Sequence, residues 1–307
     1  MPAPPEQVAT NCAAVAAFCQ KRHSESYAFI DPAKADLSDQ TVVITGASRG
    51  IGRAAAFSFV RAGCRRLVIT ARTPLHDLAA ELKKEAAAAR PGNSSTSAEL
   101  DVLALAVDVT DNASVEAAAA AVAKRFGGVV DTLVNNAGYL PASERMGEGA
   151  AADWLHCAEV NIKGLYRVSR CFLPLVLKSA TARTVINVGS QGAHYVAPTM
   201  SAYQTSKFAV CRLTEFAAIE YADEGLVAVT VHPGCLRTEL ALNLPESFHD
   251  LLVDAPELPG DTFVWIAKER RDWLTGRYME ANWDMEEFEG KKEDVIKRDV
   301  LKFRMTV

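Results

Sequence analysis

The sequence lacks any apolar run that approaches the roughly 20 residues of a membrane span. It also lacks a basic run with interleaved aromatic residues, the pattern typical of nucleic-acid binding. Its 33 Lys and Arg are outnumbered by 38 Asp and Glu, which gives a net charge of −5. We therefore expect no membrane association and no nucleic-acid partner. The 307 residues, 49% of them apolar, can bury the core of a globular protein.

The cysteines form no disulfide framework and no metal-binding pattern. There are seven, an odd number, and no pair has C-x-x-C spacing. No His/Cys cluster has metal-ligand spacing, so we expect no metal. Free thiols in a reducing compartment fit best, and we expect a cytoplasmic protein. The apolar stretch CAAVAAFC (12–19) follows no positive segment. It predicts a packed helix rather than a secretory signal.

Short β-branched runs alternate with Ala/Leu-rich segments from residue 41 onward, and no internal repeat is visible. The predicted strands are TVVIT (41–45), RLVIT (66–70), VLALAV (102–107), DTLVN (131–135), TVINV (184–188) and VAVTV (227–231). Residues 114–126 and 206–221 are predicted helices. The alternation predicts an α/β fold with a doubly wound parallel sheet, a Rossmann fold.

The predicted domain spans residues 38–283, with an N-terminal extension (1–37) and a C-terminal tail (284–307). PGNSST (91–96) predicts a surface loop between the second helix and the third strand. The apolar residues of the tail are spaced like one stripe of a solvated amphipathic helix. They are Phe288, Val295, Ile296, Val300 and Phe303.

The stretch TGASRGIG (45–52) lies between the first strand and a helix. Glycines in such a loop allow tight turning and close approach of a pyrophosphate, and the helix N-terminus offers free N–H groups. The predicted phosphate-binding residues are Gly46, Ser48, Arg49, Gly50, Ile51 and Gly52.

The second strand ends in Ala71 and Arg72, where many dinucleotide sites carry an acid for the ribose 2′-hydroxyl. Arg72 and Arg49 could instead bind a 2′-phosphate. The alternative is that both are solvated surface residues. The pattern predicts NADP(H) rather than NAD(H).

Tyr203 and Lys207, in SAYQTSKFAV, lie one helical turn apart. The pair alone is compatible with a buried tyrosine beside a surface lysine, or with two groups held together for proton chemistry. The other motifs of the chain favour the second interpretation.

Together, these motifs resemble those of the short-chain dehydrogenase/reductases over residues 38–283. TGASRGIG resembles T-G-x-x-x-G-x-G, NNAG (135–138) resembles the element after the fourth strand, and HPG (232–234) resembles the nicotinamide-carboxamide element. The resemblance implies further cofactor contacts at Asp108, Val109, Asn135, Ala137, Gly138, Tyr203, Lys207, Pro233, Gly234 and Thr238.

The resemblance also implies a catalytic tetrad of Asn161, Ser190, Tyr203 and Lys207. Tyr203 would be the general acid/base, with its pKa lowered by Lys207, which also bonds the nicotinamide ribose. Ser190 would orient the substrate oxygen, and Asn161 would hold a water linking Lys207 to solvent.

The segment 239–261 is where relatives carry a mobile substrate lid. Leu240, Leu244, Phe248 and Leu251 have near-helical spacing, and Pro245 suits the first turn of a short helix. The stripe predicts closure over a largely apolar substrate, with static core as the alternative. The predicted substrate contacts are Ser190, His194, Tyr203, Leu240, Leu244 and Phe248, although His194 could equally be packing.

The expected function is an NADP(H)-dependent carbonyl reductase or alcohol dehydrogenase acting on a small molecule. The alternatives are dehydration, epimerisation or a multi-step reaction in the same site, and an NADP(H)-sensing module without turnover. The resemblance implies a homo-oligomer, a dimer or a tetramer. LTGRYMEANWDMEEFEG (274–290) departs from the glycine-rich ending of the family's last strand, which leaves that assembly open.

Overall fold

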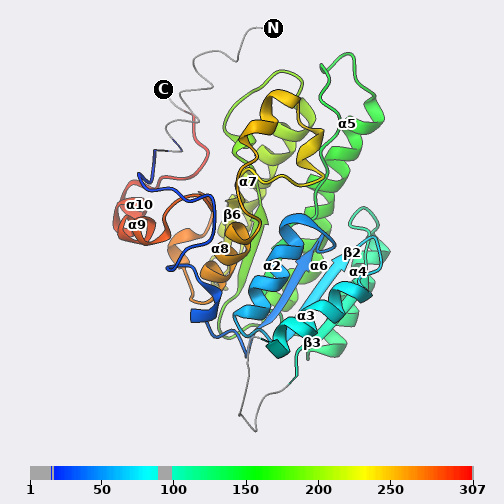
Figure 1. The fold of residues 1–307 in the computed structure, drawn as a ribbon, viewed down its shortest axis with the longest axis vertical. Coiled ribbons are helices and arrows are strands. Elements are labelled where there is room, and N and C mark those ends of the chain that lie inside the picture. The colour runs from blue at the N-terminus through cyan, green and yellow to red at the C-terminus, as the bar shows by residue number, and fades with distance from the viewer. Residues whose placement is uncertain (1–14, 16, 89–98, 306–307) are drawn as a thin grey trace.

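The computed structural model describes residues 15, 17–88 and 99–305. They form one parallel sheet in the order β3-β2-β1-β4-β5-β6-β7 (Figure 1). The strands are β1 (Thr41–Thr45), β2 (Arg66–Ala71), β3 (Asp101–Ala106), β4 (Thr132–Asn135), β5 (Thr184–Val188), β6 (Val227–His232) and β7 (Arg277–Glu280). Every position of the five strands β1 and β4 to β7 is buried, because helices cover both faces of the sheet.

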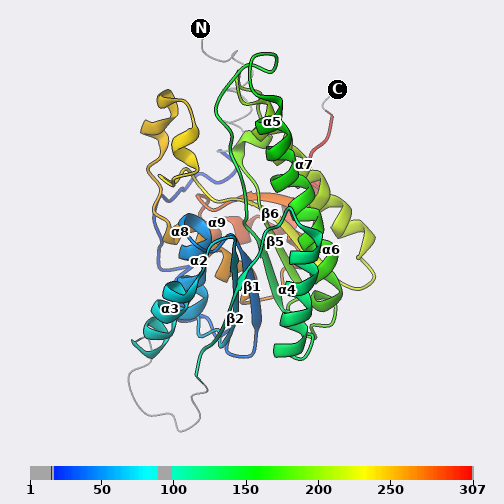
Figure 2. The same cartoon turned by 90° about the vertical axis from the view of Figure 1, so that its right-hand side faces the viewer.

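Two layers of helices enclose the sheet (Figure 2). One layer holds α2 (Gly50–Arg61), α3 (His76–Ala88) and α8 (Glu257–Ala267), and the other holds α4 (Asn112–Arg125), α6 (Leu165–Val176) and α7 (Ser201–Glu220). Phe59 and Phe263 are fully buried on the first side, and Phe172 is buried on the second. The prediction of a doubly wound α/β sheet is confirmed.

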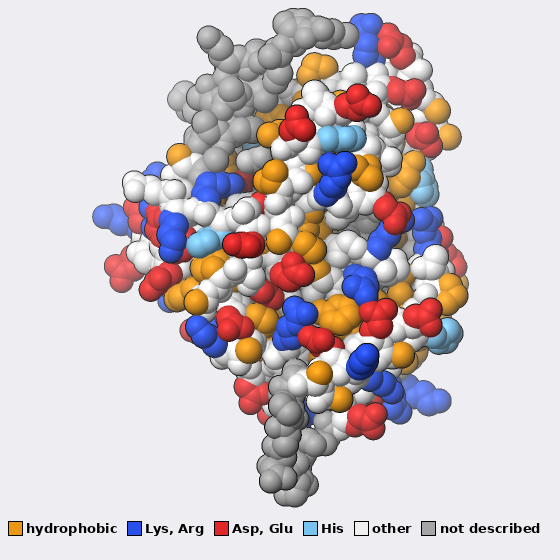
Figure 3. Space-filling model, in the orientation of Figure 1, with side chains coloured by type: hydrophobic (Ala, Val, Ile, Leu, Met, Phe, Trp, Pro, Cys, Tyr) orange, Lys and Arg blue, Asp and Glu red, His pale blue; other side chains and the backbone are white. Residues whose placement is uncertain are grey.

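The six predicted strands agree with the structure to within one residue at each end. The predicted helices correspond to α4 and α7, although α7 begins five residues earlier than predicted, at Ser201. The predicted loop 91–96 and half of the predicted helix 12–19 lie outside the described residues. On one face, acidic and basic side chains are interspersed (Figure 3).

The seventh strand, β7, was not among the predicted runs. Its end residues Arg277 and Glu280 are charged and buried, and segments distant in the sequence pair with both. Arg277 Nη2 donates to Asp299 at 2.9 Å, and Arg22 Nη2 donates to Glu280 at 2.9 Å. Tyr278 N donates to the carbonyl of Leu301 at 2.8 Å, so the C-terminal segment covers the outer edge of β7.

The tail forms two short helices instead of the single helix predicted. They are α9 (Met285–Gly290) and α10 (Lys292–Arg298), separated at Lys291, and a left-handed Asp299 (φ 49°) ends the second. Phe288 and Val295 are fully buried, whereas Ile296 is 49% exposed. The predicted solvated helix is therefore wrong, because part of its apolar stripe belongs to the main core.

Candidate active site

A cavity of about 720 Å³ lies at the carboxyl ends of the strands. Its walls come from the segments that follow β1, β2, β3, β4 and β6, and the strand order reverses between β1 and β4 at this edge. Open α/β sheets bind ligands at such a switch point. The volume is within the roughly 300–1,000 Å³ of small-molecule and cofactor sites.

The glycine loop between β1 and α2 packs too tightly for side chains. Gly46 (φ 67°) and Gly50 (φ 55°) have left-handed backbones. A Cβ at Gly46 would lie 2.8 Å from Ala137 Cα, and one at Gly52 would lie 2.4 Å from the carbonyl oxygen of Gly46. No described side chain caps the first turn of α2, so its free N–H groups can receive a phosphate.

Asn136 fastens this loop to β4. Its Nδ2 donates to the carbonyls of Thr45 at 2.9 Å and Gly46 at 3.0 Å, and the residue lines the cavity. It was not among the predicted site residues, although it stands in the NNAG motif. The predicted Asn135 does not line the cavity within the described chain, because its Nδ2 donates to Asn187 at 2.8 Å inside the sheet.

Most of the predicted cofactor residues line the cavity. They are Gly46, Ser48, Arg49, Gly50, Ile51, Arg72, Asp108, Val109, Ala137, Gly138, Tyr203, Lys207, Pro233 and Thr238. Of the described residues, Gly52, Asn135 and Gly234 support the wall instead. A Cβ at Gly234 would lie 2.7 Å from Asp254 Oδ2.

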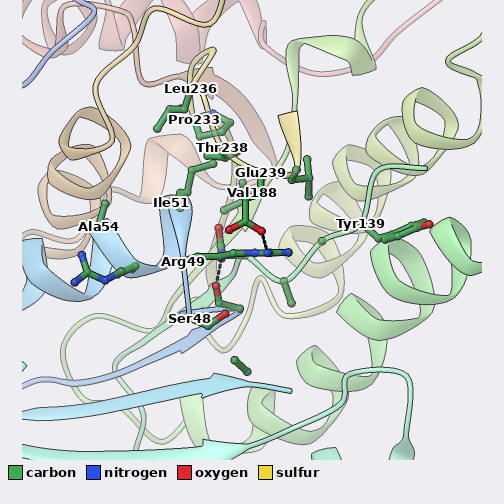
Figure 4. Close-up of a pocket in the computed structure, with 18 of the residues that line it drawn as sticks. Ser48, Arg49, Ile51, Ala54, Tyr139, Val188, Pro233, Leu236, Thr238 and Glu239 are labelled. Atoms are coloured by element: carbon green, nitrogen blue, oxygen red, sulfur yellow. Dashed lines mark hydrogen bonds and ion pairs between the residues drawn. The ribbon is translucent and has the colours of Figure 1, made fainter. Parts of the chain in front are cut away.

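The two predicted phosphate-binding arginines have different surroundings. Arg49 forms an ion pair with Glu239 across the cavity mouth, with both side chains exposed (Figure 4). Arg72 is exposed beside Asp108. Hydrogen bonds from Thr110 chiefly, and the charge of Arg72 in part, hold the pKa of Asp108 below its usual value.

Tyr203 and Lys207 lie on α7 and line the same cavity. Lys207 Nζ donates to the carbonyl of Val188 at 2.7 Å and lies 5.7 Å from the centre of the Tyr203 ring. Burial lowers the pKa of Lys207 to about 8. Burial raises the pKa of Tyr203 to about 12, although a hydrogen bond with Ser190 acts to lower it. Burial therefore dominates the Tyr203 pKa in this structure, and its lowering by Lys207 stays a prediction.

Within the described chain, Ser190 and Asn161 do not line either cavity, but Ser190 bonds to Tyr203 and Asn161 bonds to the backbone of Tyr139. Ser190 Oγ accepts a hydrogen bond from Gly192 N at 3.0 Å and caps the short helix η3 (Gln191–Ala193). Asn161 Nδ2 donates to the carbonyl of Tyr139 at 2.9 Å and to Ser206 Oγ at 2.9 Å. Ser206 lies on α7, so Asn161 joins the cavity wall to the helix that carries Tyr203.

Asn161 lies in a π-helical turn. The turn, η2 (Glu159–Gly164), joins α5 (Ala151–Ala158) to α6. Such turns occur mostly inside α-helices and frequently at functional sites. The sequence EVNIKG gave no signal that would have predicted it.

The comparison with known proteins agrees with this geometry. A family model described as short chain dehydrogenase matches residues 40–247, about two thirds of the chain. The chain belongs to the short-chain dehydrogenases.

Two fungal relatives match almost the whole chain. The short chain dehydrogenase mpl6 of Monascus purpureus is 43% identical over 290 residues, covering 94% of this chain and 97% of that protein. The short chain dehydrogenase andI of Emericella variicolor is 39% identical with the same coverage. A short chain dehydrogenase of Shigella flexneri, solved in complex with NADP, matches with a TM-score of 0.68 and 22% identity, covering 81% of this chain and 99% of that one. At this identity the structural match supports the fold alone.

The segment 239–261 of this short-chain dehydrogenase differs from the predicted helical stripe. It forms two 3₁₀ turns, η4 (Ala241–Asn243) and η5 (Glu246–Leu251), because Pro245 (ψ 143°) interrupts the helical backbone between them. The predicted end at Pro259 and Gly260 is also wrong, since both belong to α8.

The apolar residues of this segment divide into two groups. Leu240 and Leu244 pack with Tyr203 against Leu140 and Met200. Leu251 is 58% exposed. Phe248 is half-buried, and among the described residues it belongs neither to this cluster nor to the cavity lining.

A second cavity, of about 290 Å³, lies between residues 140–155 and 199–203. Leu140, Trp154 and Met200 contribute apolar walls, and Tyr203 lines both cavities. Apolar surface therefore flanks the tyrosine on the side of the second cavity.

His194 does not line either cavity in the described part of the chain. Its ring stacks on Phe303, with centroids 4.8 Å apart at 22°, and meets the Tyr278 ring edge-on at 4.1 Å. This position agrees with the alternative interpretation, a packing role, and gives no support to the predicted substrate contact.

Within the described ranges, no group of three or more His, Cys, Asp and Glu side chains is arranged to hold a metal ion.

No helix in the described part of the chain is long and apolar enough to span a membrane.

Proposed function

We propose that this short-chain dehydrogenase is an NADP(H)-dependent carbonyl reductase or alcohol dehydrogenase with Tyr203 as its general acid/base. The observation that carries the proposal is one cavity with two chemically distinct regions. Tyr203 and Lys207 occupy one region, and the other region holds Arg49 and Arg72, with no acid at the end of β2.

Reduction of a ketone adds a hydride to carbon and a proton to oxygen, so that the C=O π bond becomes C–H and O–H bonds. When the cofactor is bound, its nicotinamide supplies or accepts the hydride. Tyr203 gives the proton to the developing alkoxide, and Ser190 holds the reacting oxygen. Lys207, with its pKa lowered to about 8, keeps its proton at neutral pH yet can exchange it, which suits a proton relay.

The residues present fit a dinucleotide with a 2′-phosphate. The glycine loop excludes side chains from the cradle, and the first turn of α2 offers N–H groups. Arg72 and Arg49 supply charge, and Ala71 leaves no carboxylate to repel a phosphate or to hold a 2′-hydroxyl.

The proposed substrate is a largely apolar ketone or secondary alcohol. Leu240 and Leu244 pack beside Tyr203, which supports their assignment to the substrate lid. Phe248 lies outside this cluster, so we no longer assign it to the substrate contacts.

The test is oxidation of NADPH by purified protein with a panel of ketones, followed by absorbance, with Tyr203→Phe as the control. Turnover that depends on Tyr203 supports the proposal. Tight NADPH binding with no turnover of any ketone or alcohol would favour a sensing module. Conversion without net change in NADPH would favour dehydration or epimerisation.

We also propose a homodimer through the outer faces of α6 and α7. Tyr166, Phe216 and Ile219 are 56%, 53% and 73% exposed on these helices, a concentration that suits contact with a second copy. Sedimentation of the native protein and of Ile219→Glu tests it. A monomeric native protein would refute the dimer.

A further inference from the structure

The last described residues, 302–305, form a strap along α7, here called the C-terminal strap. Glu215 on α7 accepts hydrogen bonds from Phe303 N and from Arg304 Nη1, both at 2.9 Å. Arg212 Nη2 donates to the carbonyl of Phe303 at 3.3 Å. The side chain of Glu215 is only 7% exposed, so the strap closes over a charge that would otherwise face solvent.

The backbone before the strap is held in an unfavourable conformation. Asp299 and Leu301 have φ angles of 49° and 65°, a left-handed region that is unfavourable for a non-glycine residue. Arg277 holds this turn from β7, donating to the carbonyl of Val300 at 2.5 Å and to Asp299 at 2.9 Å. Residues in such conformations persist only where their surroundings fix them, and they concentrate at functional sites.

The strap places Phe303 on His194. The His194 ring stacks on Phe303 and also meets the ring of Tyr278, on β7, edge-on. Its Nε2 is buried and has no hydrogen-bond partner among the described residues. Because His194 lines neither cavity, its contribution is one of shape and stacking rather than proton transfer.

His194 directly follows η3, and Ser190 directly precedes it. The turn between them is closed by hydrogen bonds from Ala193 N to the Ser190 carbonyl at 3.1 Å and from His194 N to the Gln191 carbonyl at 2.9 Å. Gln191 Nε2 is also tied to Glu280 of β7 at 3.3 Å. A displacement of His194 is therefore passed to Ser190 through three residues.

We propose that Phe303 is a positioning residue for catalysis: by clamping His194 against Tyr278, the C-terminal strap fixes the turn that presents Ser190 to Tyr203. The proposal rests on the proposed reductase function. On the other side, the residue before Ser190 is held by the sheet, because Gly189 N donates to the carbonyl of Val231 on β6 at 2.9 Å. The strap supplies the second anchor, and without it the hydroxyl can move relative to the phenol.

The first experiment compares Phe303→Ala with two matched variants. Met305→Ala changes a neighbouring side chain that is 87% exposed, and Phe303→Tyr keeps the ring. A misplacement of about 1 Å at a reacting centre can cost roughly 100-fold. We expect kcat to fall by about tenfold or more in Phe303→Ala, with the Kd for NADPH within twofold of native. Met305→Ala and Phe303→Tyr should retain native kcat.

The second experiment needs no turnover. Backbone amide exchange of residues 190–194 should accelerate in Phe303→Ala and not in Met305→Ala. Faster exchange with unchanged kcat on a ketone would overturn the positioning role, as would unchanged exchange. If Phe303→Ala does not fold, Phe303→Leu replaces it, because leucine keeps the apolar volume without a ring face. The kcat and the amide exchange of residues 190–194 in Phe303→Leu then test the positioning role. If the native protein turns over no ketone, the proposed function fails, while the exchange data still decide whether the strap fixes the turn.

Discussion

Arg49 and Glu239 form an ion pair that links the glycine loop to the first residue of the lid segment. The two segments also approach each other directly, since a Cβ at Gly50 would lie 3.1 Å from Thr238 Cγ2. Both charged side chains are about two thirds exposed, at 63% and 67%. Glu239 therefore competes with any phosphate that Arg49 could bind.

Removing this competitor should tighten NADPH binding. Exposed ion pairs are worth about 0.2–1 kcal/mol, so Glu239→Gln should lower the Kd for NADPH by up to about fivefold. The Kd for NADH should change less, because NADH lacks the 2′-phosphate. Fluorescence titration measures both constants, and Glu246→Gln, on η5, is the matched control. Equal gains for the two cofactors would mean that Glu239 repels the shared pyrophosphate instead.

The preference for NADPH over NADH should depend on residues 71 and 72, at the end of β2. Ala71→Asp combined with Arg72→Ser removes one cation and adds the missing acid, so the preference for NADPH should shift toward NADH. A charged hydrogen bond contributes roughly 1.5–3 kcal/mol, which corresponds to ten- to hundred-fold in kcat/KM. Ala71→Asn with native Arg72 is the control. A native protein with equal kcat/KM for both cofactors would contradict the assignment.

Tyr203→Phe should retain NADPH binding and lose most turnover, because only the proton-donating hydroxyl is removed. Lys207→Ala should impair both binding and turnover. Single-turnover absorbance and a separate binding titration distinguish the two effects. Near-native kcat in Tyr203→Phe would show that another group supplies the proton.

The packing of His194 should appear in the pH dependence of stability. Burial chiefly, with the nearby His232 acting in the same sense and Glu280 opposing, lowers the pKa of His194 to about 4. Between pH 6.5 and 4 the unfolded chain binds a proton that the folded protein resists, so the free energy of unfolding falls as pH falls. The loss is up to about 3 kcal/mol, less where the partly exposed ring keeps some water.

His194→Phe should keep the ring stacked on Phe303 and should not lose unfolding free energy as the pH falls, because phenylalanine binds no proton. The difference in urea unfolding free energy between native protein and His194→Phe should therefore shift between pH 7.5 and 4.5, in favour of the variant at low pH. His232 and Glu280 are unchanged between the two proteins, so the comparison isolates the effect of His194. A difference that does not change with pH would place His194 in a more hydrated setting.

Phe288 should behave as a core residue although it lies in the tail. It is fully buried, with ring centroids 5.1 Å from Trp283 and 4.9 Å from Trp273. Phe288→Ala should cost about 3–5 kcal/mol of unfolding free energy. Ile296→Ala, which truncates a half-exposed residue of α10, should cost about 1 kcal/mol or less. Similar small costs for both would indicate that the tail detaches without loss of the domain.

The sequence predicted the elements whose structure is decided by a local pattern of residues. The six apolar strands and the glycine loop were predicted because buried parallel strands read as continuous β-branched runs. β7 was missed because RYME begins and ends with charges, whose burial depends on Arg22 and Asp299. No local pattern encodes partners so distant in the chain.

The sequence predicted most residues that come together at the site. It did not predict which of their side chains face the cavity. Tyr203 and Lys207 were predicted from their spacing of one helical turn, together with the other motifs. The neighbours Asn135 and Asn136 could not be ranked, because only the register of β4 decides which side chain reaches the glycine loop. The lid was predicted as helical from its apolar spacing, whereas Pro245 divides it.

The edge of β7 also has a consequence for how the chain is made. Gln20 and Arg22 bond to Glu287 and Glu280, which lie 267 and 258 residues later, and Phe18 packs on Trp283. At the roughly 5–20 residues per second of synthesis, the early segment waits about 13–50 s for these partners. During translation its aromatic residues have no native cover. The contacts that cover the edge of the sheet therefore cannot form until Glu287 has been synthesised.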